Sequence, residues 1–250
     1  MKIRFLGTNG WFSTASGSTA CAAIILKNRL VVLDAGEGLH KAPALAKQEG
    51  ITNIDIFISH LHLDHAIGLH TLPMFPEKCS VRLLAHKGYA KGLQTLLDHP
   101  YTASAKELFA DVRTIPLKEG ENRLPYSATA LPLRHADPSW GYRLELQGKS
   151  IAYCTDTGPC ENLVRLAEGA DAFITECSLK PGAPELREWP HLSPEMAAMA
   201  ASKAAAKLLL LTHFDALRYR NQRARKGAEK AARRIFKNSR AAHDGMEITL

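Results

Sequence analysis

Short runs of apolar residues alternate with helix-like stretches along the whole chain. Residues 54–59 have the length of a strand and a continuous apolar core, whereas residues 88–98 place their leucines on one face, as a helix does. Residues 194–206 are rich in alanine, and Ser193 is a favourable N-cap for a helix there. The pattern predicts strands over residues 3–7, 22–26, 30–33, 54–59, 81–85, 112–115, 126–133, 142–146, 150–154, 172–175, 208–211 and 247–250, and helices over residues 88–98, 194–206 and about 221–236.

The order of these elements predicts two sheets. Strands come first in groups and then alternate with helices, in both halves of the chain. We therefore expect an α/β protein with two packed sheets and helices outside them, rather than a doubly wound sheet. No linker or shift in composition divides the chain, so we expect a single domain over residues 1–250.

The composition is that of a soluble globular protein. Hydrophobic residues make up 46% of the 250 residues, and charged residues make up 23%. No apolar run approaches the roughly 18 residues of a membrane-spanning helix, and the first residues lack the apolar core of a signal peptide. The five cysteines are scattered without a C-x-x-C pair, which is typical of a reducing compartment. We expect a cytoplasmic protein with no membrane partner.

Positive charge is concentrated near the C-terminal end of the chain. The formal net charge is +7, and residues 218–240 contain ten Lys or Arg residues and a single acid, Glu229. This segment is compatible with a polyanionic partner such as RNA, but on this feature alone a solvated helix with basic outer faces is favoured.

Four potential metal ligands follow the predicted strand over residues 54–59. They are His60, His62, Asp64 and His65. Histidines two residues apart at a strand end face the same side, and the chain must turn at the residues that follow. Imidazoles and carboxylates are ligands of zinc and similar divalent ions, and a buried cluster of this kind without a metal would leave polar groups unsatisfied. The segment therefore predicts a metal site.

A carboxylate also ends the strand predicted over residues 30–33. Asp34 precedes a glycine turn, and alone it would be interpreted as a turn-forming residue. Beside the histidine cluster, we expect it to hold a ligand imidazole in place.

These motifs together resemble the metallo-β-lactamase superfamily. The resemblance rests on Asp34, on the cluster just described, and on single residues that each follow a later apolar strand, namely His135, Asp156 and His213. It covers nearly the whole chain and implies a four-layer αββα sandwich with two divalent metal ions. Zinc is the expected metal, although manganese or iron also suits a mixed histidine and carboxylate site.

The resemblance also implies which residues bind each metal. One ion takes His60, His62 and His135, the other takes Asp64, His65 and His213, and Asp156 bridges the two. Seven ligands leave room for a bridging water, which fits a catalytic site better than a structural one.

The flanking residues resemble ribonuclease Z and related phosphodiesterases of this superfamily. Residues 153–159 resemble the motif around the bridging aspartate, and residues 218–219 resemble the arginine–tyrosine pair of that branch. His191 matches the extra histidine of the branch, which contacts the phosphate and helps the leaving group. Glu176 is the carboxylate expected to orient it. The resemblance further implies a homodimer.

Two features depart from bacterial ribonuclease Z. Asp156 follows His135 by only 21 residues, which leaves no space for the long arm that grips tRNA in that enzyme. Leu63 also stands where a glycine is usual. Both features favour an armless relative, similar to the cyclic phosphodiesterase of bacterial phosphonate breakdown.

We therefore expect a dinuclear metal phosphodiesterase that hydrolyses a small cyclic or nucleotide-like phosphodiester by metal-activated hydroxide. Asp64 would orient the hydroxide, and His191, held by Glu176, would stabilise the phosphate or protonate the departing oxygen. Three alternatives stay open. They are a tRNA 3′-processing endoribonuclease (ribonuclease Z activity), a hydrolase of esters, thioesters or lactams on the same scaffold, and a nucleic-acid-binding protein that acts through residues 218–240.

Overall fold

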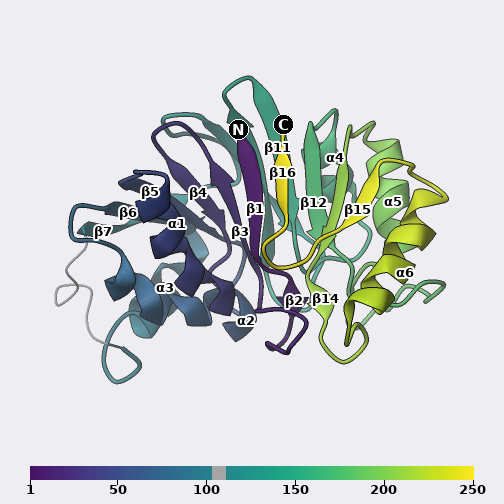
Figure 1. The fold of residues 1–250 in the computed structure, drawn as a ribbon, viewed down its shortest axis with the longest axis horizontal. Helices are drawn as coiled ribbons and strands as arrows, with labels where there is room; N and C mark the ends of the chain where they lie inside the picture. Colours follow the sequence, from purple (N-terminus) through teal and green to yellow (C-terminus); the bar gives the residue numbers. More distant parts are fainter. Residues whose placement is uncertain (103–110) are drawn as a thin grey trace. The chain divides into compact units, whose positions relative to one another are not determined.

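The computed structural model describes residues 1–102 and 111–250, which form two compact units (Figure 1). Unit 1 contains Met1–Thr8, Ser18–Leu117 and Asp244–Leu250, and unit 2 contains Asn9–Gly17 and Lys118–His243. Each unit holds one of the two predicted sheets, and each sheet has seven strands. The single domain expected from the sequence stays a prediction.

Unit 1 is built on a mixed sheet with the strand order β16-β1-β3-β4-β5-β6-β7. Neighbouring strands are antiparallel from β16 to β4 and parallel from β4 to β7. The strands are β1 (Lys2–Gly7), β3 (Cys21–Ile25), β4 (Leu30–Leu33), β5 (Asn53–Ile58), β6 (Ser80–His86), β7 (Asp111–Leu117) and β16 (Glu247–Thr249).

The helices of unit 1 pack their apolar residues against this sheet. Leu45 of α1 and Leu93 of α3 belong to the same buried cluster as Val32 of β4 and Ile56 of β5. The α-helices are α1 (Ala42–Gln48), α2 (Leu63–Ala66) and α3 (Ala90–Leu96), and the 3₁₀ helices are η1 (Glu37–Lys41), η2 (Ile67–Met74) and η3 (Lys87–Tyr89).

Unit 2 is built on a second sheet, with the strand order β15-β13-β12-β11-β10-β9-β8. The strands from β8 to β11 are antiparallel, and those from β11 to β15 are parallel. They are β8 (Gly120–Arg123), β9 (Ser127–Leu133), β10 (Ser139–Leu146), β11 (Lys149–Cys154), β12 (Ala172–Glu176), β13 (Leu209–Thr212) and β15 (Ser239–Ala241). The short strands β2 (Asn9–Gly10) and β14 (Phe214–Asp215) form a separate parallel pair.

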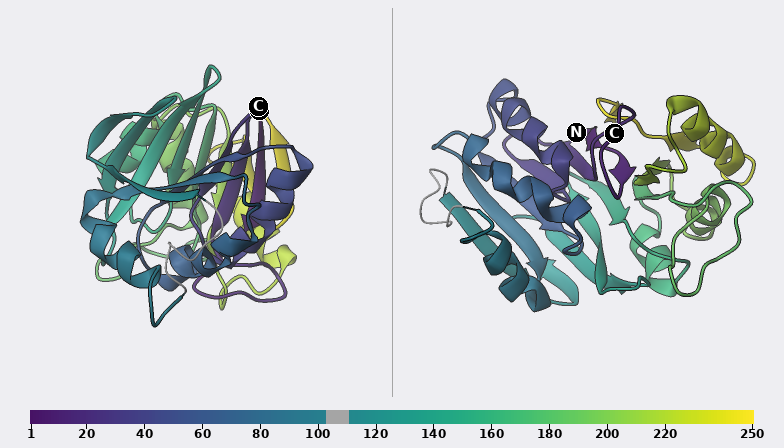
Figure 2. Two further views of the ribbon diagram at one scale, coloured as in Figure 1. Left: turned by 90° about the vertical axis from the view of Figure 1, so that its left-hand side faces the viewer. Right: turned by 90° about the horizontal axis from the view of Figure 1, so that it is seen from below.

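Three α-helices cover the sheet of unit 2. They are α4 (Glu161–Ala167), α5 (Pro194–Lys203) and α6 (Gln222–Arg233), and Figure 2 shows them from two further sides. The Ser193 hydroxyl caps α5 by accepting a hydrogen bond of 3.3 Å from the Met196 N–H. The alanines of α5 are small enough to pack closely on β12 and β13. Among the described residues, no helix is long and apolar enough to span a bilayer.

Every predicted strand is present in the structure, and the three predicted helices are present but shorter. Residues 88–98 divide between η3 and α3. The prediction omitted α1 and α4, which have seven residues each. Two helical turns are shorter than the window over which helical periodicity can be recognised, so the pattern could not reveal them.

Candidate metal centre

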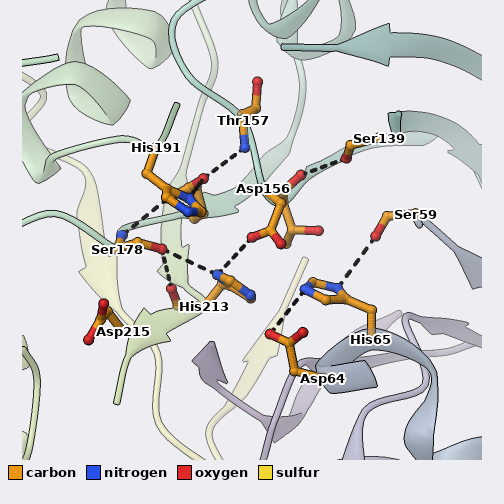
Figure 3. Close-up of polar contacts among 12 residues, drawn as sticks. Ser59, Asp64, His65, Ser139, Asp156, Thr157, Ser178, His191, His213 and Asp215 are labelled. Carbon is orange, nitrogen blue, oxygen red and sulfur yellow. Dashed lines mark hydrogen bonds and ion pairs between the residues drawn. The ribbon is translucent and has the colours of Figure 1, made fainter. Parts of the chain in front are cut away.

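The loop after β5 brings three imidazoles of unit 1 together. β5 ends two residues before His60, and α2 begins directly after His62. The ring centroids of His60 and His62 lie 4.5 Å apart, and those of His60 and His65 lie 4.2 Å apart. Asp64 Oδ2 lies 3.5 Å from His65 Nε2 (Figure 3). All four candidate ligands of this unit therefore lie at one strand end.

Asp34 holds His65 and Ser59 in place through its carboxylate. It is fully buried directly after β4, and its Oδ2 accepts a hydrogen bond of 2.6 Å from His65 Nδ1. The Ser59 N–H and hydroxyl donate to the same carboxylate at 2.7 and 2.9 Å, and His60 Nδ1 lies 3.0 Å from the Ser59 oxygen. With Nδ1 held in this way, each ring presents Nε2 as a ligand atom, which is how proteins orient metal-binding histidines.

The same contacts set the charge of Asp34. Burial raises the pKa of this carboxyl, but the charge of His65, its hydrogen bond and the Ser59 N–H together outweigh burial. The pKa of Asp34 therefore lies below its ordinary value of 3.8, and the group is a carboxylate that only accepts hydrogen bonds.

Three buried residues of the predicted site share an unusual backbone conformation. Asp34, Asp156 and His213 have φ angles of 60°, 49° and 49°, in the left-handed region that non-glycine residues rarely adopt. Asp34 and His213 directly follow β4 and β13, and Asp156 lies two residues beyond β11. Such strain at strand ends is typical of functional sites, and no pattern in the sequence predicted it.

In unit 2, His213 is held by polar groups on one side and by backbone on the other. Its Nδ1 lies 3.1 Å from Asp156 Oδ1 and 3.3 Å from the Ser178 hydroxyl, as Figure 3 shows. A Cβ atom added to Gly10 would lie only 2.5 Å from the His213 ring. Sequence reasoning missed both Ser178 and Gly10, because nothing in a single sequence indicates which residues contact the imidazole of a candidate ligand.

Glu176 ends β12 in a fully buried position and accepts four hydrogen bonds. The Thr157 N–H and His191 Nδ1 donate to Oε1 at 2.7 and 2.8 Å, and the Ser178 and Leu192 N–H groups donate to Oε2 at 3.2 and 3.1 Å. The carboxylate is therefore fixed in place and orients the His191 ring.

This contact makes His191 and Glu176 a buried ion pair. Burial lowers the pKa of His191, but the charge and hydrogen bond of Glu176 and the charge of Asp156 raise it to about 9. Burial raises the pKa of Glu176, and the charge of His191 outweighs that effect and lowers it. Ligand atoms of Asp156, Glu176 and His191 lie within 4.8 Å of one another, but the four donors on Glu176 favour the ion pair over a metal there.

His135 is half-buried two residues beyond β9. Its ring centroid lies 5.5 Å from that of His191 and 6.1 Å from that of Trp189. Unit 2 thus carries His135, Asp156 and His213, the three ligands expected from it, together with the His191 pair.

The basic segment over residues 218–240 is not uniformly exposed. It forms α6 and its flanks, and Arg223 lies in solvent. Arg225 is only 1% exposed, donates a hydrogen bond to the Asn9 side chain, and lies 4.8 Å above the Phe214 ring. The interpretation of this segment as basic surface is therefore wrong for Arg225, because this residue packs inside unit 2.

Comparison with known proteins assigns the family. Residues 29–214 match the family model of the beta-lactamase superfamily domain. The chain belongs to the β-lactamase superfamily. Among curated members, ribonuclease Z of Archaeoglobus fulgidus is 26% identical over an alignment of 306 positions, gaps included. The alignment covers 99% of this chain and 97% of that protein. Ribonuclease BN of Cronobacter sakazakii is 28% identical, and the alignment covers 100% of both chains.

Solved structures of the superfamily have the same fold. The metallo-β-lactamase fold protein YhfI from Bacillus subtilis superposes with a TM-score of 0.81 at 19% identity, covering 99% of this chain and 98% of that chain. The short form of human tRNase Z superposes with a TM-score of 0.73 at 24% identity, covering 100% and 99%. These likenesses confirm the expected metallo-β-lactamase fold. Together with the curated relatives, they identify a metal-dependent hydrolase similar to ribonuclease Z.

Proposed function

We propose that this superfamily member is a dinuclear metal phosphodiesterase that hydrolyses a small cyclic or nucleotide-like phosphodiester. The proposed ligands are His60, His62 and His135 for one ion, Asp64, His65 and His213 for the other, and Asp156 for both. Imidazoles held through Nδ1, as in both units, suit zinc, and they also suit manganese or iron. When bound, the ions supply a water of lowered pKa and offset charge on the phosphate oxygens.

The buried pair of His191 and Glu176 carries the proposal. An ester or lactam hydrolase on this scaffold needs no such pair, whereas a phosphodiesterase must stabilise a departing alkoxide. Glu176 occupies Nδ1 of His191, so Nε2–H is the proton that can reach the departing oxygen or the phosphate. A pKa of about 9 keeps this proton in place at neutral pH. We assign Asp64 the role of orienting the attacking water and accepting its proton.

A tight hairpin favours a small substrate over tRNA. The interval between His135 and Asp156 is filled by β10 and β11, and these strands are joined by Gln147 and Gly148 alone. Both joining residues have positive φ, as a two-residue hairpin turn of type I′ requires. This interval therefore contains no projecting arm that could grip a tRNA.

The test is the variant His191→Ala, with His40→Ala as the matched control, because His40 is an exposed histidine outside the predicted site. We expect His191→Ala to keep both metals and to lower phosphodiester turnover by about 10²–10⁴-fold, the usual size of an acid–base contribution. The loss should be greater for an alkyl leaving group than for p-nitrophenolate, which needs little protonation. Unchanged turnover, or faster hydrolysis of a thioester or lactam than of any phosphodiester, would favour the ester-hydrolase alternative.

Processing of tRNA is the second candidate, and the exposed cations of α6 are the observation that favours it. Arg223, Lys226 and Lys230 are exposed on this helix. If they bind RNA phosphates, kcat/KM for a precursor tRNA should fall steeply as salt rises and in the double variant Arg223→Gln/Lys226→Gln. Accurate removal of a 3′ trailer with this salt dependence would replace the small-substrate proposal.

A further inference from the structure

An exposed tryptophan of unit 2 lies beside two imidazoles of the predicted site, those of His135 and His191. Trp189 lies between β12 and α5 in a segment without regular structure, and it is 56% exposed. Its ring centroid lies 6.1 Å from that of His135 and 6.0 Å from that of His191, with interplanar angles of 65° and 58°. The indole therefore stands beside both rings instead of packing into the core.

The backbone around this tryptophan is fixed. Pro190 packs so closely on Gly158 that a Cβ atom added to the glycine would lie 2.7 Å from the proline Cβ. The Leu192 N–H donates to Glu176 Oε2 at 3.1 Å, and its carbonyl accepts from the Leu179 N–H at 3.0 Å. The backbone that directly follows Trp189 is thus held in place, which lowers the free-energy cost of ordering this segment around a ligand.

The position of His191 relates Trp189 to one end of the substrate. In the proposed reaction, His191 Nε2 contacts the oxygen that departs from phosphorus. The organic group on that oxygen then leaves past His191, whose ring centroid lies 6.0 Å from that of the indole, which places Trp189 within reach of it. An exposed indole presents a flat apolar face, and planar rings such as nucleobases stack on such faces with little dependence on sequence.

We propose that Trp189 is a specificity-determining residue that stacks on a planar ring, a nucleobase or an aryl group, on the leaving-group side of the scissile phosphodiester. The substrate class is then nucleoside or aryl phosphodiesters rather than diesters of aliphatic alcohols. This inference rests on the proposed function of the same site, and it adds the identity of the group that the site recognises.

Binding to the metal-loaded enzyme tests the stacking directly. Isothermal titration calorimetry compares adenosine 5′-monophosphate with ribose 5-phosphate, which carries the same phosphate without the base. In Trp189→Leu, which keeps bulk but loses the flat ring, the Kd of the nucleotide should rise by about 5- to 150-fold, the range for loss of one stacked base. The Kd of ribose 5-phosphate should stay unchanged, and Trp189→Phe should restore most of the nucleotide affinity.

Kinetics provide a second readout that separates this role from that of His191. With bis(p-nitrophenyl) phosphate, Trp189→Leu should raise KM and leave kcat nearly unchanged, because stacking stabilises ground state and transition state alike. Equal weakening of both binding probes, or a nucleotide Kd that does not change in Trp189→Leu, would overturn the inference. If the wild-type enzyme hydrolyses no phosphodiester, the proposed function fails, and the two binding probes still decide the role of Trp189.

Discussion

A single added methyl group at Gly10 should displace His213, a proposed metal ligand. Gly10 lies in β2, which pairs with β14, and β14 begins at the residue after His213. A Cβ atom on Gly10 would lie 2.5 Å from Cε1, 2.7 Å from Nδ1 and 2.9 Å from Nε2 of the His213 ring. The backbone of Gly10 is not in the left-handed region, so backbone strain does not add to this steric conflict.

The size of the conflict follows from ordinary contact distances. Cβ contacts below 3.4 Å are uncommon, so the ring or the strand must move by about 0.9 Å. Ligand atoms must stay within about 0.2 Å of their bonding distance, so this movement cannot be absorbed at the ligand bond. We expect Gly10→Ala to weaken one of the two metals by about 10- to 100-fold, the cost of losing support for a ligand histidine. Turnover should fall by about 10²-fold.

Metal titration with a chromophoric chelator and elemental analysis after dialysis measure the effect. Gly227→Ala is the matched control, because a Cβ atom there meets nothing within 4 Å and the residue lies inside α6. This control should keep both metals and gain about 1 kcal/mol of stability from helix propensity. If Gly10→Ala bound two metals with wild-type affinity, the view that Gly10 shapes the position of His213 would be wrong.

Three further predictions concern the bridging ligand, a buried arginine and an acid-sensitive ion pair. Asp156→Ala should lose more than one metal equivalent by elemental analysis, whereas His213→Ala should weaken only one, because only the former is proposed to touch both ions. In urea denaturation, Arg225→Met should cost about 2–4 kcal/mol through loss of its buried hydrogen bonds, and Arg223→Met should cost less than about 0.5 kcal/mol. Asp171→Asn should cost about 1 kcal/mol at pH 7, and its cost should vanish as the pH falls from about 4 to 2.

The sign of the last prediction follows from the contacts of Asp171. Burial raises the pKa of this carboxyl, but the Ser150 N–H at 3.0 Å and the ammonium groups of Lys207 and Lys149 outweigh it and lower the pKa to about 2. Its stabilising effect is thus complete above the unfolded value near 3.8 and is lost as the carboxyl becomes protonated. The two lysines are largely exposed, so solvent screening reduces the expected energy.

Each of these predictions compares two measurements, and the two must differ if the reasoning is right. Equal metal loss in Asp156→Ala and His213→Ala would contradict the bridging role. Equal stability of Arg225→Met and Arg223→Met would show that the buried guanidinium contributes nothing. A cost of Asp171→Asn that stays constant between pH 7 and pH 2 would contradict the lowered pKa.

The sequence determined most of the strands, apart from the short β2, β8, β14 and β15, and it determined the local cluster of candidate ligands. A strand such as β5 is recognisable because side chains of a buried strand are nearly all apolar, and that property belongs to consecutive residues. His60, His62, Asp64 and His65 are likewise close in the chain, so the turn after β5 is enough to bring them together. The short helices α1 and α4 escaped prediction because two turns carry too little periodicity.

Contacts between residues distant in the chain were decided only by the tertiary structure. The sequence suggested Asp34 as a support, but the hydrogen bond to His65 depends on the pairing of β4 with β5. Gly10 against His213 depends on the pairing of β2 with β14. From the sequence, Arg225 is interpreted as one more surface cation. In the structure it lies on the face of α6 that packs into unit 2, where it is buried over Phe214. Local patterns encode which face of an element is apolar, whereas the partner that meets that face is fixed only when the sheet and its helices pack.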